Sequence, residues 1–224
     1  MPLAPDQALT AALGLTGLGG TPTVAPASAF GARTPFVGRQ MAALGPAWEL
    51  TWQGYRLALP SARGAADRYT RTVVVRVAQG SGQFLGATLR AGELPAGVRP
   101  TPDGEVAQDQ LRRASESYAG LPAVPPRVSL VRALDAVLEQ GVGSPLQASE
   151  IQALYVMHTQ RNRPAIPAWV ITLNGIPPLP HSGPEGAQVP VWQRNHLRNV
   201  VDASTGRLLF ATTVPQPTAA LAVS

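Results

Sequence analysis

The sequence predicts an α+β protein made of two repeats, each a helix packed on a small antiparallel sheet. The main observation is internal similarity, since Ala47–Gly54 and Ala168–Gly175 both read Ala-Trp-x-apolar-Thr-apolar-polar-Gly. Two further matches keep the same order and a similar offset: 8–13 with 133–138, and 77–88 with 201–212. Fixed-offset similarity is the sequence mark of a repeated structural unit. The opposing interpretation is coincidence in a chain rich in Ala, Leu and Gly.

Each repeat is expected to begin with a short amphipathic helix. In the second half, apolar residues recur at helical spacing across 130–138, and the matching segment of the first half is 8–13. Ser129 is suited to cap the second helix at its N-terminus, and Gly141 or Gly143 is suited to end it.

Strands are expected to follow each helix, because apolar and polar residues then alternate with a period of two. The strands predicted in the second half are 151–160, 168–174, 197–201 and 207–213. Asp202 and Gly206 are predicted as structural turn residues of the closing hairpin, because Asp bonds turn backbone and Gly accepts a left-handed conformation. In the first half, strands 69–77 and 83–89 are expected to flank a turn at 80–82.

These elements define four predicted regions: a first repeat at 1–90, a linker at 91–126, a second repeat at 127–214 and a loose tail at 215–224. The linker begins with Pro and Gly, and its later part, 103–119, is a possible helix. Inside the second repeat, 176–190 contains several prolines and is expected to form a long irregular excursion.

The composition excludes several classes of function. The net charge is +5, and every one of the 18 basic residues is an arginine. These arginines are spread from Arg33 to Arg207 without a basic stripe, so no nucleic-acid partner is predicted. Cysteine is absent, which excludes disulfides and cysteine metal sites. No apolar run is long enough for a membrane-spanning helix, and 1–18 contains no recognisable signal peptide.

The sequence lacks the usual signatures of catalysis. His158, His181 and His196 are the only histidines, and no two of them have metal-site spacing. There is no nucleophile elbow, no phosphate-binding loop and no dinucleotide fingerprint. We therefore predict no enzyme activity, no metal and no cofactor.

The second half resembles the PepSY-like family. The residues that carry this resemblance are Ala168 to Ile171 in one strand and, in the closing hairpin, Val200, Val201, Asp202, Ala203, Thr205, Gly206 and Leu208. In the first half the resemblance holds only through the internal similarity, and Ala78 stands where the turn aspartate is expected. The excursion at 176–190 also departs from the compact family pattern. The resemblance implies a small extracytoplasmic module involved in peptidase inhibition or in regulating local protein activity, with no catalytic residues.

Taken together, these features predict a non-catalytic extracytoplasmic binding or regulatory module for a protein or peptide partner. The candidate binding residues are Trp192, His181, Arg194 and His196, because they lie in or beside the excursion and Trp192 is suited to anchor a partner. The alternative is a structural subunit of the cell envelope that forms homo-oligomers through its sheet edges. A peptidase inhibitor and an acid-based enzyme are less favoured.

Overall fold

The computed structural model describes residues 2–27, 45–62, 70–91, 116–140, 143–160, 163–176 and 196–213. Its helical elements are α1 (Pro5–Thr16), α4 (Leu130–Gln140) and the 3-10 turns η1 (Pro60–Ala62) and η2 (Pro145–Gln147). Its strands are β1 (Thr23–Ala27), β2 (Ala47–Tyr55), β3 (Arg71–Ala78), β4 (Phe84–Arg90), β5 (Glu116–Gly120), β6 (Glu150–Gln160), β7 (Ile166–Asn174), β8 (His196–Asp202) and β9 (Leu208–Thr213).

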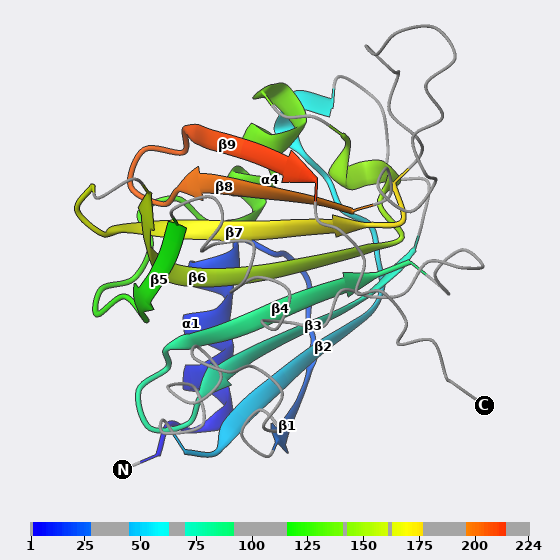
Figure 1. The fold of residues 1–224 in the computed structure, drawn as a ribbon. Coiled ribbons are helices and arrows are strands. Elements are labelled where there is room, and N and C mark those ends of the chain that lie inside the picture. The colour runs from blue at the N-terminus through cyan, green and yellow to red at the C-terminus, as the bar shows by residue number, and fades with distance from the viewer. Residues whose placement is uncertain are drawn as a thin grey trace, which may run out of the picture.

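The strands of the described ranges form one nine-stranded antiparallel sheet (Figure 1). Its order is β1-β2-β3-β4-β6-β7-β8-β9, and β5 pairs with β6 beside this path. Neighbours in the order are mostly neighbours in sequence, which is the pattern expected when short connections join antiparallel strands.

The prediction of two repeats, each with a helix on its own small sheet, is wrong. The two halves join where Ala87 to Arg90 of β4 pair with Ala153 to Glu150 of β6. Two separate sheets would each expose an unpaired edge at this point, and pairing the edges satisfies their backbone groups. The larger hydrophobic core likewise runs through both halves without a boundary.

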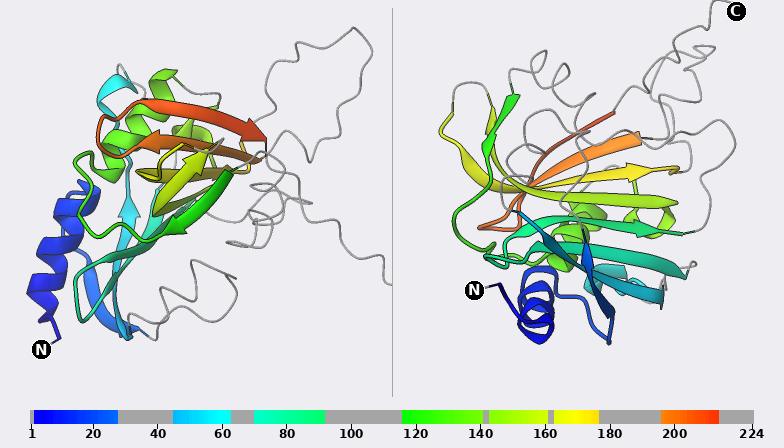
Figure 2. Two further views of the ribbon diagram at one scale, coloured as in Figure 1. Left: turned by 60° about the vertical axis from the view of Figure 1, so that its left-hand side comes forward. Right: turned by 90° about the horizontal axis from the view of Figure 1, so that it is seen from below.

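Both helices cover the same face of the sheet (Figure 2). The sequence of β3 shows why this face is apolar, since Val73, Val75 and Val77 are fully buried while the residues between them are only partly buried. Side chains alternate between the faces of a strand, so these three valines point toward the helices. The core that they share with α1 and α4 fixes the positions of both helices.

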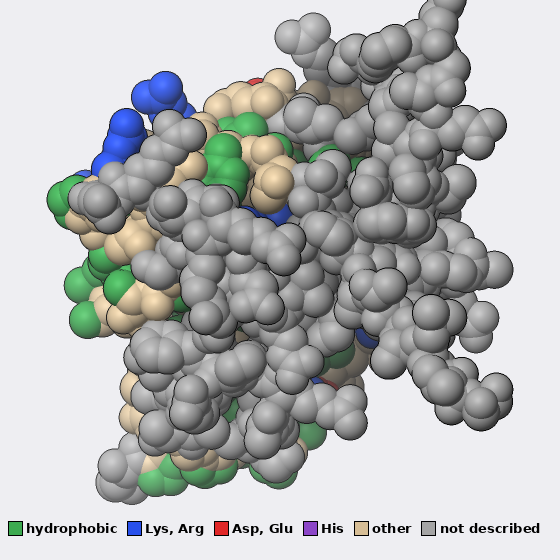
Figure 3. Space-filling view, viewed as in Figure 1, with side chains coloured by type: hydrophobic (Ala, Val, Ile, Leu, Met, Phe, Trp, Pro, Cys, Tyr) green, Lys and Arg blue, Asp and Glu red, His purple; other side chains and the backbone are tan. Residues whose placement is uncertain are grey.

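The opposite face has a smaller apolar cluster, to which Val156, Val170 and Val200 contribute. His158 lies on this face, as its alternation with Val156 predicts, and its ring lies 5.6 Å from that of Phe210. Among the described side chains that are visible in Figure 3, most are hydrophobic or neutral, and basic ones show mainly at the upper left. No helix among the described residues is long and apolar enough to cross a membrane.

Most predicted elements are present, with one exception in the linker. The helix predicted at 130–138 is confirmed as α4, and Ser129 lies at its N-terminus. The helix proposed for 103–119 is wrong in its last part, because Glu116–Gly120 forms β5 on the edge of β6. Residues 103–115, the excursion from 177 onward and the tail lie outside the described residues.

Two indoles, that of Trp169 fully buried and that of Trp48 partly buried, fix the entries to the helices. The Nε1–H of Trp48 donates to the carbonyl of Leu3 at 2.9 Å, and that of Trp169 donates to the carbonyl of Val128 at 2.7 Å. Each carbonyl lies two residues before a helix begins. Both tryptophans therefore have a structural role, since they position the segment that leads into each helix.

Candidate functional site

The sheet divides along one edge of β6. The ladder between β4 and β6 ends at Ala87 and Ala153, and further along the same edge β5 pairs with β6 up to Gly120 and Met157. β4 and β5 therefore pair with different parts of this edge, and the chain that leaves β5 passes the place where the two strands separate. We call this segment, 121–128, the strap.

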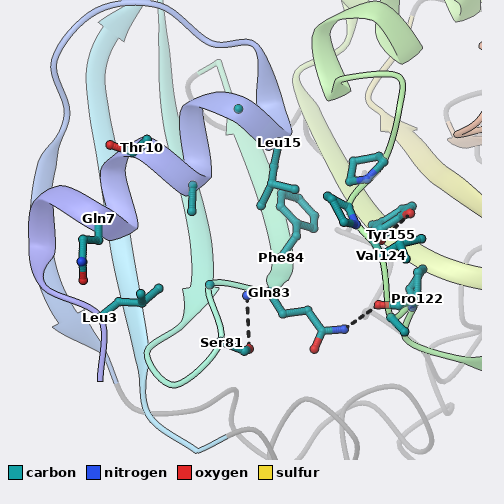
Figure 4. Close-up of a pocket in the computed structure, with 16 residues that line it drawn as sticks. Leu3, Gln7, Thr10, Leu15, Ser81, Gln83, Phe84, Pro122, Val124 and Tyr155 are labelled. Atoms are coloured by element: carbon teal, nitrogen blue, oxygen red, sulfur yellow. Dashed lines mark hydrogen bonds between the residues drawn. The ribbon is translucent and has the colours of Figure 1, made fainter. Parts of the chain in front are cut away.

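The strap is held by three side chains that donate to its carbonyl groups. Gln83 Nε2 donates to Pro122 at 3.0 Å, and the Tyr155 hydroxyl donates to Val124 at 3.0 Å (Figure 4). The indole of Trp169 holds the far end, as described above. A proline-rich segment has few N–H groups of its own, so fixing it through its carbonyls is the arrangement that its chemistry allows.

A groove lies between the strap and α1. Its cavity has a volume of about 610 Å³, and Phe84 and Tyr155 form its floor. Leu15 of α1 and the turn at 81–83 complete its sides (Figure 4). This volume lies within the range of roughly 300–1,000 Å³ that is usual for ligand pockets.

The lining of the groove is apolar with a few neutral polar groups. None of the described residues that line it is charged, and its side chains with polar groups are Gln7, Thr10, Ser81, Gln83 and Tyr155. Gln83 extends from the turn toward the strap (Figure 4). Glutamine side chains can donate to and accept from a peptide bond. The groove therefore suits an uncharged occupant with apolar groups and amides.

The floor of the groove rests on a packed aromatic cluster. The ring of Trp169 lies 5.1 Å from that of Phe84, edge to face, and 5.1 Å from that of Tyr155. Such pairs add about 0.5–1.5 kcal/mol beyond their buried area. Burial raises the pKa of Tyr155 above its ordinary value, so its phenol stays protonated and continues to donate to the strap.

A second, more polar pocket of about 460 Å³ lies between α4 and the turn joining β8 to β9. Asp135 and Glu139 line this pocket, and a carboxylate oxygen of each lies within hydrogen-bond distance of the Ser61 hydroxyl, which donates its single proton to one of them at a time. Asp135 also accepts from the backbone N–H of Ser61 at 2.8 Å, and Arg132 lies 3.8 Å from its carboxylate. These contacts tie η1 to α4, which gives both carboxylates a structural role. Across the described ranges, no group of three or more His, Cys, Asp or Glu could hold a metal ion.

Of the four predicted binding residues, only His196 lies within the described ranges. His181, Trp192 and Arg194 lie outside the described residues. His196 begins β8 opposite Asn174, and its side chain is likewise not described.

The predicted turn residues both lie in the turn between β8 and β9. Asp202 accepts from the backbone N–H of Ser204 at 2.8 Å and from the hydroxyl of Thr205 at 2.9 Å. Gly206 has a φ of 76°, in the left-handed region that favours glycine. Its N–H donates to the carbonyl of Asp202 at 2.8 Å, which closes the turn.

The groove could not be predicted from the sequence. Alternation along β6 places Tyr155 on the face opposite Leu154, but it does not show which distant segment covers that face. The available signal is the run Leu121-Pro122-Ala123-Val124-Pro125-Pro126, which falls at the end of the predicted linker. No protein-family model matches the chain, and neither the curated proteins nor the solved structures give a significant match.

Proposed function

We propose that the protein is a non-catalytic binding module whose groove takes an uncharged, apolar segment of a peptide or protein partner. The observation that carries the proposal is a cavity of about 610 Å³ with an aromatic floor, neutral amide and hydroxyl groups and no described charged residue in its lining. A charged ligand would lose its hydration here without gaining an opposite charge. An apolar peptide segment instead gains burial for its side chains and amide partners for its backbone.

The position of Val124 supports a protein-like occupant. Val124 belongs to the strap, lines the groove and is 62 % exposed, the more exposed of the two large hydrophobic residues that are exposed in the described ranges. An occupant lying between the strap and α1 would cover it. An extracytoplasmic location remains part of the proposal and rests on the PepSY-like resemblance alone.

Filling the groove from α1 tests the proposal. Gly14 lines the groove and a Cβ at this position meets no atom within 4 Å, so the side chain of Gly14→Leu begins in open space at the wall of the groove. Replacing a helical glycine also raises helix stability by up to about 1 kcal/mol. We expect the variant to retain or raise its thermal midpoint while its peptide affinity falls by about tenfold or more.

The probe is a set of capped heptapeptides with Val, Leu or Pro at their centres, and a matched set has Asp or Lys there. Binding is measured by titration calorimetry and by NMR shifts of the α1 amides. The control is Gly19→Leu, since Gly19 is equally open but does not line the groove. The proposal is wrong if the charged peptides bind as tightly as the apolar ones, or if Gly14→Leu binds like the unmodified chain.

A further inference from the structure

The two outer strands of the sheet differ in how well they resist pairing with another strand. β1 has five residues and contains Pro26, which has no N–H to donate. β9 has six residues, Leu208 to Thr213, with no proline, glycine or charged side chain among them. Proline, charge and β-bulges are usual protections of a sheet edge. β1 contains a proline, whereas β9 contains neither proline nor charge, and its only protection of this kind is the register shift at Leu209.

An exposed apolar side chain marks the same edge. Leu209 is 38 % exposed. In the described part of the chain, Leu209 and Val124 of the strap are the two large hydrophobic residues that are exposed. Leu209 lies where the pairing of β9 with β8 shifts, between the register positions of Leu208 and Phe210. Exposed apolar edge strands favour the addition of another strand.

We propose that two copies of this chain pair through β9, antiparallel, about a two-fold axis that passes perpendicular to the sheet at Ala211. A two-fold axis perpendicular to the sheet leaves each side chain on the face that it occupies in the monomer. Directly opposed residues of a sheet point to the same face, whereas neighbours along a strand point to opposite faces. The residue at the axis must therefore lie opposite its own copy. Centring on Ala211 places Leu209 opposite Thr213 and opposes only small side chains at the axis.

The distribution of charge is compatible with this pairing. The charged residue nearest to β9 along the chain is Arg207, which directly precedes the strand. In the proposed register the two copies of Arg207 are eight positions apart, roughly 27 Å at the usual rise per residue. That separation exceeds the screening length of about 8–10 Å at moderate salt, so the two charges repel weakly.

The expected dimer is weak and depends on concentration. Centring on Ala211 pairs residues 209–213 of the two copies, so each copy contributes five residues of β9. Such a strand pair buries less than the roughly 1,200–2,000 Å² of a stable specific interface. Its stability comes from backbone hydrogen bonds along the edge and from burial of Leu209. Self-association should therefore follow mass action over an ordinary range of protein concentration.

Charges placed at the axis test the proposal. Ala211→Glu and Ala211→Lys each bring two like charges together across the axis, which should weaken self-association by about tenfold or more. An equal mixture of the two variants should restore association, because Glu then lies opposite Lys. The measurement is sedimentation velocity of the full chain from about 1 to 500 µM, a range over which a weak dimer dissociates.

Two further variants complete the experiment. Ala25→Glu places the same charge at the centre of β1 and should leave self-association unchanged. Leu209→Gln removes the exposed apolar group without adding charge and should weaken association by about threefold. Circular dichroism and the thermal midpoint establish that each variant is folded.

A single monomer mass for the unmodified chain across the whole range would overturn the proposal. Equal weakening by Ala25→Glu and Ala211→Glu would also overturn it, as would an Ala211→Glu and Ala211→Lys mixture that stays monomeric. The inference is independent of the groove, so Gly14→Leu should associate like the unmodified chain.

Discussion

Tyr155 shows how one side chain serves both the core and the strap. Its ring belongs to the aromatic cluster under the groove, while its hydroxyl holds the Val124 carbonyl. Burial and this hydrogen bond both favour the protonated phenol, since a phenolate could not donate. The residue therefore connects the stability of the fold to the position of the strap.

Removing this hydroxyl should have an effect that depends on pH. At neutral pH we expect Tyr155→Phe to lower the free energy of unfolding by about 1 kcal/mol, because one hydrogen bond is lost. The pKa of Tyr155 is raised in the folded protein, so the stability that it contributes is present below about pH 10 and falls as the pH rises further. The difference between the two proteins should thus shrink or reverse in strong alkali.

Urea unfolding at pH 7 and at about pH 11 measures this difference, and absorbance of tyrosinate follows the ionisation directly. The remaining tyrosines are common to both proteins, so the comparison isolates Tyr155. A difference in stability that stays constant across the two pH values would contradict the assigned role.

At the residue scale, the predictions that held were those that depend on near neighbours in the chain. Asp202 and Gly206 bond within their own turn, so a short sequence window contains all the relevant partners. The partners of Tyr155 and Gln83 are 31 and 39 residues away. No local pattern identifies contacts at such separations.

At the scale of elements, a buried carboxylate secures the joint between the two halves of the sheet. Glu150 of β6 is fully buried, and it accepts from Arg90 of β4 at 2.8 Å and from Asn174 of β7 at 3.2 Å. Gln152 of its own strand also donates to it. One side chain thus bonds three adjacent strands at the ends of their ladders.

Removing this carboxylate should weaken the joint markedly. We expect Glu150→Ala to cost about 1–3 kcal/mol, because it removes a fully buried side chain and its hydrogen bond from the Asn174 amide, while the Arg90 side chain is 57 % exposed and can be hydrated. The matched control is Glu49→Ala, which breaks the ion pair with Arg76 of β3. Both of those side chains are about one third exposed, so the expected cost is about 0–1 kcal/mol. Denaturant unfolding compares the two variants, and equal losses would contradict this account.

The predicted strands were mostly correct because alternation is a local property, but their assembly was not. Sequence similarity between 47–54 and 168–175 suggested two independent sheets. Whether β4 pairs with β6 depends on a register between residues that lie about 60 positions apart in the chain. The end of the linker was misassigned for a related reason, since β5 is a strand only because the edge of β6 receives it.

At the scale of the whole molecule, the continuous sheet and shared core imply cooperative unfolding. Leu134 of α4 and Val75 of β3 are both fully buried in the same core cluster, although they belong to different halves. The hydrogen bonds of Ser61 to α4 and of Arg71 to the carbonyls around η2 also cross between the halves. Loss of either half would expose the core of the other.

We therefore expect one calorimetric transition with equal calorimetric and van't Hoff enthalpies. Leu134→Ala should lower its midpoint by an amount corresponding to about 3–5 kcal/mol, and Val75→Ala should lower the same transition by a smaller amount. Two transitions, only one of which responds to each variant, would show instead that the halves unfold separately.

The aromatic cluster beneath the groove makes the fluorescence of Trp169 sensitive to what the groove holds. Trp169 is fully buried and in ring contact with both floor residues, yet it does not itself line the groove. A guest that shifts Phe84 or Tyr155 should alter the emission of this indole without touching it. The molecule thus carries a built-in optical signal, and a loss of that signal in Trp169→Phe would assign it to this cluster.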